Sequence, residues 1–425
     1  MTSLGGLVRA LGPQGLLTLG DQLVVAHCHH FALFLEQTVL DALGGESLAL
    51  RRQAAFEAAH AMLAPRCAEL RAATPGDKLE AATDLFAAMG HGRLRFQLGP
   101  EGGTVEAEAL HHAAGFLAKY GGRTKTRAPV DAFAAGYCSA AASLAFPSDW
   151  GRFEAEEIGC AARGERVCSF TLTRRAERPR FGAVITRQLV EASEPQPSSD
   201  GWDPAPPPRG ARGPTPVGAP LDTLTADGRG LIQAYGVYLA LLPVGYMGQV
   251  TFDPTHLLER RSPELAPVLE ALVREAAQVG AFHLLGGMLA STDMAAIHGP
   301  PGEDAWERLK QLLSLCRTLG WGALSPVDFT PGRALVLRAP TTPECVYYAA
   351  RHGATLRHRL VLLQGIALGL MQLLERVDFA AADPIRPDTY VGLFRSGPRL
   401  TVEETRSPLR GDPACEVRVE VAGVP

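Results

Sequence analysis

The chain has 425 residues, of which 46% are hydrophobic and 20% are charged, and its formal net charge is −4. This length and apolar content are enough for two ordinary cores and exclude a largely disordered protein. The weak negative charge gives no general attraction to nucleic acid, so we expect no nucleic-acid partner.

Eight cysteines are scattered along the chain, which is not the density of a secreted disulfide scaffold. The start of the chain carries only Arg9 before a weak apolar stretch interrupted by glycine, which does not fit a signal peptide. We therefore expect a cytoplasmic protein.

The first cluster of chemical interest is His27-Cys28-His29-His30. Adjacent residues on a helix or strand point apart, so at most two of these side chains can converge on one ligand. Apolar residues then recur at helical spacing from Phe31. The cluster is therefore interpreted as a helix start, with a ligand site as the alternative.

The next segments predict a helix, two strands and a second helix. A helix capped by Asp77 carries apolar residues every three or four positions and closes at Gly90. Alternating residues over 94–98 and 105–109 predict antiparallel strands. A second helix follows around Gly136, where a glycine inside a helix indicates close packing on another backbone.

A hairpin over residues 153–172 completes this unit, and the whole series occurs a second time. Residues 301–419 repeat the capped helix, the strands, the glycine-bearing helix and the hairpin. We expect the two copies to superpose, with three matched pairs: Gly90 with Gly320, Gly136 with Gly365, and Cys168 with Cys415. The order predicts an α+β fold of two tandem repeats, each an antiparallel sheet with helices packed mainly on one face.

The expected domains are repeat A at 14–175, a linker at 176–222 and repeat B at 223–422. Proline and serine dominate the linker, which favours extended conformations over a packed core. The uncharged segment 230–252 is long enough to cross a membrane. Its proline, glutamines and glycines argue against a span, so we predict buried strands or helix there and no membrane span.

Cys160 and Cys168 stand eight residues apart around the turn at Gly164, so a regular hairpin places both on one face. That separation suits two thiolates on one Zn²⁺. By the logic of the repeat, the nearest further ligands are Cys138, His111 and His112. The alternative is that both cysteines only fill a sheet–helix interface, which is favoured in repeat B because Ser407 stands in place of Cys160.

The Glu156-Glu157 and Glu403-Glu404 pairs place one carboxylate of each pair on the inner face of a strand. A buried carboxylate can act as an acid or base when its pKa is raised. We favour a structural role, in which it binds backbone N–H groups or an arginine. No phosphate loop, dinucleotide fingerprint or nucleophile elbow accompanies these residues.

Taken together, these motifs resemble the 4-vinyl reductase (4VR) domain. Repeat A carries the series as Met89-Gly90-His91-Gly92, Gly136-Tyr137, Glu156, Cys160, Gly164, Cys168 and Phe170. Repeat B carries Leu319-Gly320-Trp321-Gly322, Gly365, Glu403, Gly411, Cys415 and Val417, without the first cysteine. The resemblance implies the fold of TRAPP vesicle-tethering subunits and, more distantly, of haem-based nitric-oxide sensors. It also implies a metal at Cys160 and Cys168, in repeat A only.

Domains of this kind resemble bacterial regulatory modules that bind small molecules, and we expect a non-catalytic role of that type, or a scaffolding role. One alternative is a reductase or accessory factor of tetrapyrrole metabolism, which would need a borrowed electron donor. Another is a protein-interaction module of TRAPP-like fold, with the repeats packed as a pseudo-dimer or the chain as a homodimer. An apolar small molecule is expected between helices and sheet, with Phe86, Phe116, Phe133 and Tyr137 in repeat A and Trp321, Tyr348, Leu362 and Ile366 in repeat B as lining candidates. The favoured alternative for each of these residues is plain core packing.

Overall fold

The computed structural model describes residues 3–122, 126, 129–148, 151–176, 219–381, 384–386, 388–395 and 398–423. Most of the predicted linker, 177–218, lies outside the described residues, and so does the expectation that it lacks regular structure. A short helix, α8 (Ala219–Asp222), ends the predicted linker.

Repeat A follows a short opening segment of α1 (Leu4–Leu7), β1 (Arg9–Leu11) and η1 (Gly12–Gln14). Its elements run in the order strands, helices, strands, helices, strands. They are β2 (Leu16–Leu19), β3 (Gln22–Cys28), α2 (His29–Leu43), α3 (Glu46–Glu69), α4 (Pro75–Ala88), β4 (Arg95–Gly99), β5 (Gly102–Ala107), α5 (His111–Tyr120), α6 (Ala132–Ala145), β6 (Arg152–Gly159), η2 (Ala161–Arg163) and β7 (Cys168–Arg175).

Repeat B has the same order, with α11 (Thr292–His298) and α15 (Thr389–Arg395) as additions. The matching elements are β8 (Ile232–Ala234), β9 (Val237–Pro243), α9 (Val244–Arg261), α10 (Ala266–Ala290), α12 (Ala305–Thr318), β10 (Ser325–Thr330), β11 (Ala334–Ala339), α13 (Pro343–His352), α14 (Val361–Arg376), β12 (Leu400–Arg406), η3 (Pro408–Arg410) and β13 (Cys415–Val421). The duplicated order extends upstream of the predicted first helix, to a strand pair and two further helices in each repeat.

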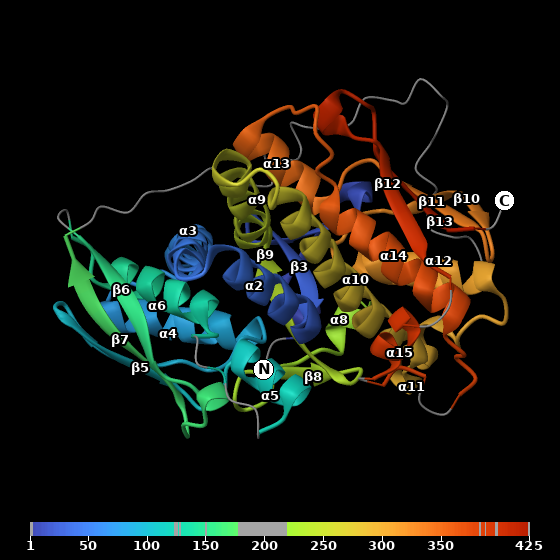
Figure 1. The fold of residues 1–425 in the computed structure, drawn as a ribbon. Coiled ribbons are helices and arrows are strands. Elements are labelled where there is room, and N and C mark those ends of the chain that lie inside the picture. Colours follow the sequence, from blue (N-terminus) through green and yellow to red (C-terminus); the bar gives the residue numbers. More distant parts are fainter. Residues whose placement is uncertain are drawn as a thin grey trace.

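Each repeat has its own four-stranded antiparallel sheet, in the order β4-β5-β7-β6 in repeat A and β10-β11-β13-β12 in repeat B. Burial alternates along β6, as expected for a sheet with one face on the core and one toward water. In Figure 1 the helices α4 and α6 lie against the first sheet and α12 and α14 against the second. The predicted α+β class is confirmed.

The two helix glycines occupy equivalent places. A Cβ added at Gly136 of α6 would lie 2.4 Å from the carbonyl oxygen of Arg52 in α3. One added at Gly365 of α14 would lie 2.2 Å from the carbonyl oxygen of Arg274 in α10. In both repeats the glycine allows two helix backbones to touch, which is the close packing predicted from the sequence.

A third sheet, which the sequence did not predict, joins the repeats. Its order is β1-β2-β3-β9-β8, so that β3 of repeat A pairs antiparallel with β9 of repeat B. Ala26 lies opposite Leu241 in this pairing. The uncharged segment 230–252 therefore forms β8, β9 and the start of α9. No helix among the described residues is long and apolar enough to cross a membrane.

Each Gly-x-Gly turn docks on the central strand of the other repeat. The amide of Leu241 donates to Met89 O, and the amide of Ala26 donates to Leu319 O, both at 2.9 Å. Gly90 has a positive φ of 89°, and a Cβ there would lie 2.6 Å from Leu239 O, so only glycine fits this approach. These symmetric contacts interleave the two halves.

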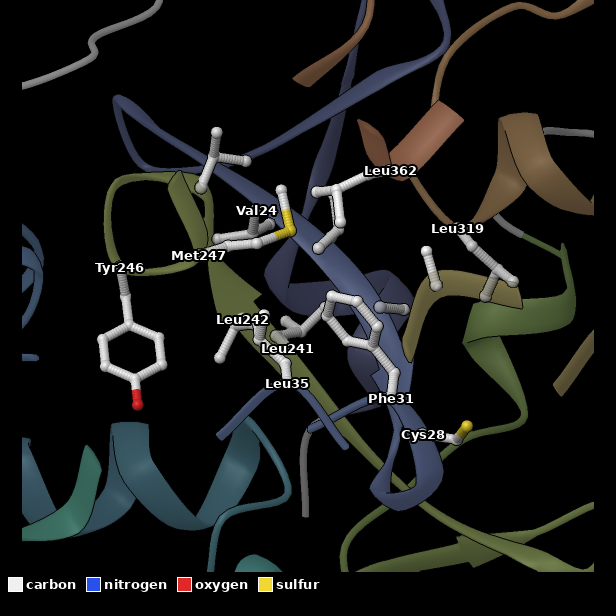
Figure 2. Packing of buried hydrophobic residues seen from close by; sticks show 14 of the residues in the cluster. Val24, Cys28, Phe31, Leu35, Leu241, Leu242, Tyr246, Met247, Leu319 and Leu362 are labelled. Carbon is white, nitrogen blue, oxygen red and sulfur yellow. The ribbon is translucent and has the colours of Figure 1, made fainter. Parts of the chain in front are cut away.

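The helices that follow the central strands also exchange partners, because α2 packs on α10 and α9 packs on α3. Figure 2 shows the resulting cluster, to which β3 and α2 contribute Val24 and Phe31, and β9 and α14 contribute Leu242 and Leu362. One continuous hydrophobic core therefore spans both repeats.

Candidate metal and ligand sites

The cysteine hairpin of repeat A brings together three groups that could hold a metal ion. Cys160 and Cys168 flank the turn η2 between β6 and β7, and Asp131 precedes α6. One ligand atom from each lies within 4.8 Å of the other two, and all three side chains are fully buried. The thiol of Cys160 is 3.5 Å from Oδ2 of Asp131.

The charge balance of this group favours a cation. Glu157 adjoins it and accepts a 2.9 Å hydrogen bond from the amide of Asp131 through Oε2. Oε1 of Glu157 and Oδ1 of Asp131 are buried without a hydrogen-bond partner. Burial and the neighbouring acidic groups hold the pKa of Asp131 well above its ordinary value, and burial also raises the pKa of Glu157. The thiol of Cys168, followed by burial, raises the pKa of Cys160. These acids can ionise together only beside a positive charge.

The donor set fits Zn²⁺. Two thiols and one carboxylate are among the sulfur and oxygen donors that zinc takes, and the ligand atoms of Asp131, Cys160 and Cys168 all lie within 4.8 Å of one another. Such an ion would tie the hairpin to the start of α6.

Repeat B has lost this donor set. Ser407 replaces Cys160 and Leu360 replaces Asp131, so that Cys415 is the one donor of the three with a counterpart. Glu404, the counterpart of Glu157, accepts hydrogen bonds from the backbone amides of Arg359 and Leu360, both at 2.8 Å. The glutamates of both hairpins thus bind backbone N–H groups, the structural role favoured from the sequence.

The further ligands expected for the metal lie elsewhere. The group that could hold a metal includes Asp131 and contains neither Cys138 nor the histidines. His111 belongs to a separate buried cluster, and His112 forms an ion pair with Glu36. Parity along the chain could not reveal Asp131, because its approach depends on how α6 begins.

The separate cluster consists of His27, His91 and His111, each about 1% exposed. The His27 ring centroid is 5.1 Å from that of His111 and 6.4 Å from that of His91. Nε2 of His91 contacts Leu241 O at 2.7 Å, whereas Nε2 of His27 and both ring nitrogens of His111 are buried without a partner. Burial lowers the pKa of His27 to about 3, so the ring is neutral.

Glu36 in α2 organises the adjoining buried network. It pairs with Arg51 of α3 at 2.8 Å and with His112 of α5 at 3.1 Å, and it accepts a 2.5 Å hydrogen bond from Tyr246 of α9. Burial alone would raise the pKa of Glu36, but His112 and Arg51 outweigh it and lower the value to about 2. Because Tyr246 belongs to repeat B, this network links the repeats.

Three of the four ligand candidates in repeat A pack together. Phe86 lies 4.5 Å from Tyr137 and 6.1 Å from Phe133 between ring centroids, and all three are fully buried. Phe116 lies apart from them, beside Tyr120. The rings of repeat A therefore fill their own core.

Three of the four candidates in repeat B border open space. Trp321 and Ile366 line two neighbouring cavities, of about 20 Å³ and about 10 Å³. Both volumes count the space that the centre of a water molecule can occupy. Leu362 lines the second cavity. Tyr348 lies apart, against Phe252.

The two repeats differ here because of matched substitutions. Cys316 and Ile366 of repeat B stand at the places of Phe86 and Tyr137 in repeat A. Smaller side chains leave the space that rings fill in the other copy. The larger cavity is also bordered by His27, whose Nε2 has no partner.

Comparisons with known proteins give few relatives. No protein-family model matches the chain, and no curated protein matches it. The resemblance to the 4VR domain therefore rests on the motif residues alone. Among solved structures, the phenol-responsive sensory domain of the transcription activator PoxR, determined with phenol, matches with a TM-score of 0.32 and 16% identity, over 45% of this chain and 81% of that one.

Proposed function

We propose that the chain is a non-catalytic regulatory protein that binds a small, largely apolar molecule in the core of repeat B. The observation that carries this proposal is the cavity at Cys316 and Ile366, where repeat A is filled by Phe86 and Tyr137. An apolar cavity lowers stability in proportion to its volume, and the space lies where the other copy carries two aromatic rings, which supports a binding role for repeat B.

The walls indicate the kind of ligand. Phe31, Leu284 and Leu285 make the cavity apolar, and Nε2 of His27 adds one buried polar atom. This combination suits a flat apolar ring with a single hydroxyl group. About 20 Å³ admits one water molecule, so a larger ligand must move Ile366 or Trp321, which separate the two cavities.

The metal contributes structure in this proposal. Zinc at Cys160, Cys168 and Asp131 would hold the hairpin of repeat A against α6, while hydrogen bonds to Glu404 perform that task in repeat B. Repeat A then acts as the rigid half, and repeat B as the half that admits the ligand.

Substitutions at one position test the ligand site in both directions. Phenol is the probe, and calorimetric titration measures its affinity for the full chain. Cys316→Ala enlarges the cavity and should raise the affinity several-fold, whereas Cys316→Leu fills it and should lower the affinity by a similar factor. Equal affinities in the two variants, or no binding to any of them, would refute the proposal.

A further inference from the structure

A separate cleft lies on the boundary between the repeats, outside the metal group and the cavities of repeat B. Its volume is about 300 Å³, within the range of small-molecule sites. The start of α2 and the end of α5 form one side, and β9, α10 and α15 form the other. The residues that carry its chemistry are His29, His30, Lys119, Tyr238 and His283.

Three imidazole rings form a stack along this cleft. The His30 ring lies 4.1 Å from that of His29 and 3.9 Å from that of His283, with an angle of 16° between the planes of the latter pair. Lone pairs of imidazole lie in the ring plane, so two parallel rings cannot direct theirs at one ion. The stack is therefore unsuited to a shared metal.

The polar groups at the cleft are mainly hydrogen-bond donors or cations. The amide of Tyr238 donates to Nδ1 of His29 at 3.0 Å, which leaves Nε2 of that ring protonated and able to donate. His30 and His283 are only 8% and 5% exposed, and no hydrogen bond joins either to another described residue. Nζ of Lys119 lies 3.4 Å from the centroid of the Phe34 ring.

The N-terminus of α2 adds positive electrostatic potential at the cleft. The N-cap of α2 is Cys28, whose side chain makes no capping hydrogen bond, although its sulfur lies near the amides of His30 and Phe31. The positive end of a 15-residue helix therefore lies beside the histidine stack.

Negative charge is scarce around these groups. The described lining of the cleft contains no aspartate or glutamate. The nearest acids act from outside it: Glu275 of α10 acts on Lys119, and Asp41 of α2 acts on Tyr120. The remaining titratable groups that face the stack are the phenols of Tyr238 and Tyr390 and the thiol of Cys28, whose pKa burial raises to about 11.

Burial lowers the pKa values of the basic side chains at the cleft and so disfavours their charged forms. Burial lowers the pKa of His29 and of His283 to about 4, and that of Lys119 to about 8. Burial followed by the charge of His283 also lowers the pKa of His30. An anion in the cleft would supply the missing counter-charge and restore protons to these groups.

We propose that this inter-repeat cleft binds a small carboxylate with a flat apolar body, and that binding takes up protons. The carboxylate would meet Lys119 and Nε2 of His29, while the apolar body would lie against Phe34 and Val237. This site is independent of the cavity proposed for repeat B.

Benzoate and benzamide, titrated calorimetrically into the full chain, test the proposal, because they share a shape and differ in charge. Benzoate should bind at pH 6 and about tenfold more weakly at pH 8, because proton uptake makes the affinity pH-dependent. Its binding heat should depend on the ionisation enthalpy of the buffer, which supplies the protons. Benzamide should bind at least tenfold more weakly at pH 6. Equal binding of the two compounds, or a heat independent of the buffer, would overturn the proposal.

Variants locate the site. Lys119→Met should weaken benzoate binding at least tenfold, and His283→Asn should reduce proton uptake. Lys310→Met, which removes a surface lysine paired with Glu307, is the matched control and should change neither. Cys316→Leu should leave benzoate binding intact, because it alters the other cavity. Unchanged affinity in both Lys119→Met and His283→Asn would refute the cleft as the site, whatever the fate of the phenol site.

Discussion

Glu36→Gln should destabilise the protein strongly, because it removes the negative charge at the centre of a buried network. Arg51 is 2% exposed and pairs with Glu36 at 2.8 Å. Leaving one partner of a buried ion pair without its counter-ion costs roughly 3–5 kcal/mol. The glutamine oxygen can still accept from Tyr246, so we expect about 3 kcal/mol, the low end of that range.

Equilibrium unfolding in urea measures this change, with two comparisons. Glu46→Gln breaks an exposed pair with Arg261, which also joins the two repeats, and should cost at most about 1 kcal/mol. The double variant Glu36→Met, Arg51→Met removes both charges and should be less destabilised than Glu36→Gln. A loss below 1 kcal/mol in Glu36→Gln, or a double variant as unstable as the single one, would show that the network does not hold the repeats together.

The same residue sets a pH dependence whose sign follows from its lowered pKa. Glu36 falls from the ordinary value of 4.5 to about 2 in the folded protein. Its stabilisation is therefore complete above about pH 4.5 and is lost as the pH falls toward 2. Glu36→Gln should remove this part of the acid sensitivity, which unfolding measured between pH 5 and pH 2 would detect.

Three further predictions concern the metal, the helix glycines and the linker. Elemental analysis should find about one zinc per chain, which Cys168→Ser should abolish and Cys415→Ser should preserve, because Leu360 and Ser407 remove two ligands from repeat B. In thermal unfolding, Gly365→Ala should lower the free energy of unfolding by about 1–3 kcal/mol, because its Cβ would lie 2.2 Å from Arg274 O. Gly392→Ala is the control, because its Cβ would meet nothing within 4 Å, and it should be neutral or slightly stabilising. Limited proteolysis should cut first within 191–218, where proline and serine dominate; first cuts within 130–145 would contradict the proposed domain boundaries.

The elements of each repeat could be predicted because local patterns determine them. Period-two alternation predicted strands in the four-stranded sheet of each repeat. The recurrence of Gly136 and Gly365 identified the helix whose backbone touches another helix. The cap at Asp304 holds, with a 2.8 Å hydrogen bond from the amide of Glu307. In repeat A the N-cap is Thr74 and not Asp77. The Thr74 side chain accepts from the amide of Asp77, and the Asp77 side chain accepts from the amide of Thr74, so this capping box begins three residues earlier than expected.

The central sheet and the inter-repeat cleft could not be predicted in the same way, whereas Trp321, Leu362 and Ile366 at the cavities of repeat B were among the predicted residues. Nothing in the residues of β3 indicates that its partner is β9, more than 200 positions away, because backbone hydrogen bonds between strands form whatever the side chains are. The histidines gave a partial signal. His29 does begin a helix, as expected, but its stack with His30 and His283 depends on the docking of α2 on α10 of the other repeat.

The exchange of helices between repeats places parts of both proposed binding regions on α2. Because α2 packs on α10 and α9 packs on α3, the start of α2 lies beside repeat B while Glu36 binds Arg51 of repeat A. Phe31 of α2 borders the cavity of repeat B together with His27 at the end of β3. His29 and His30 of α2 border the cleft, and Glu36 accepts a hydrogen bond from Tyr246 of repeat B. A ligand in either proposed region would therefore lie against a helix that contacts both repeats. A duplicated fold with separate cores would lack this arrangement, because no helix of one copy would then line a space in the other.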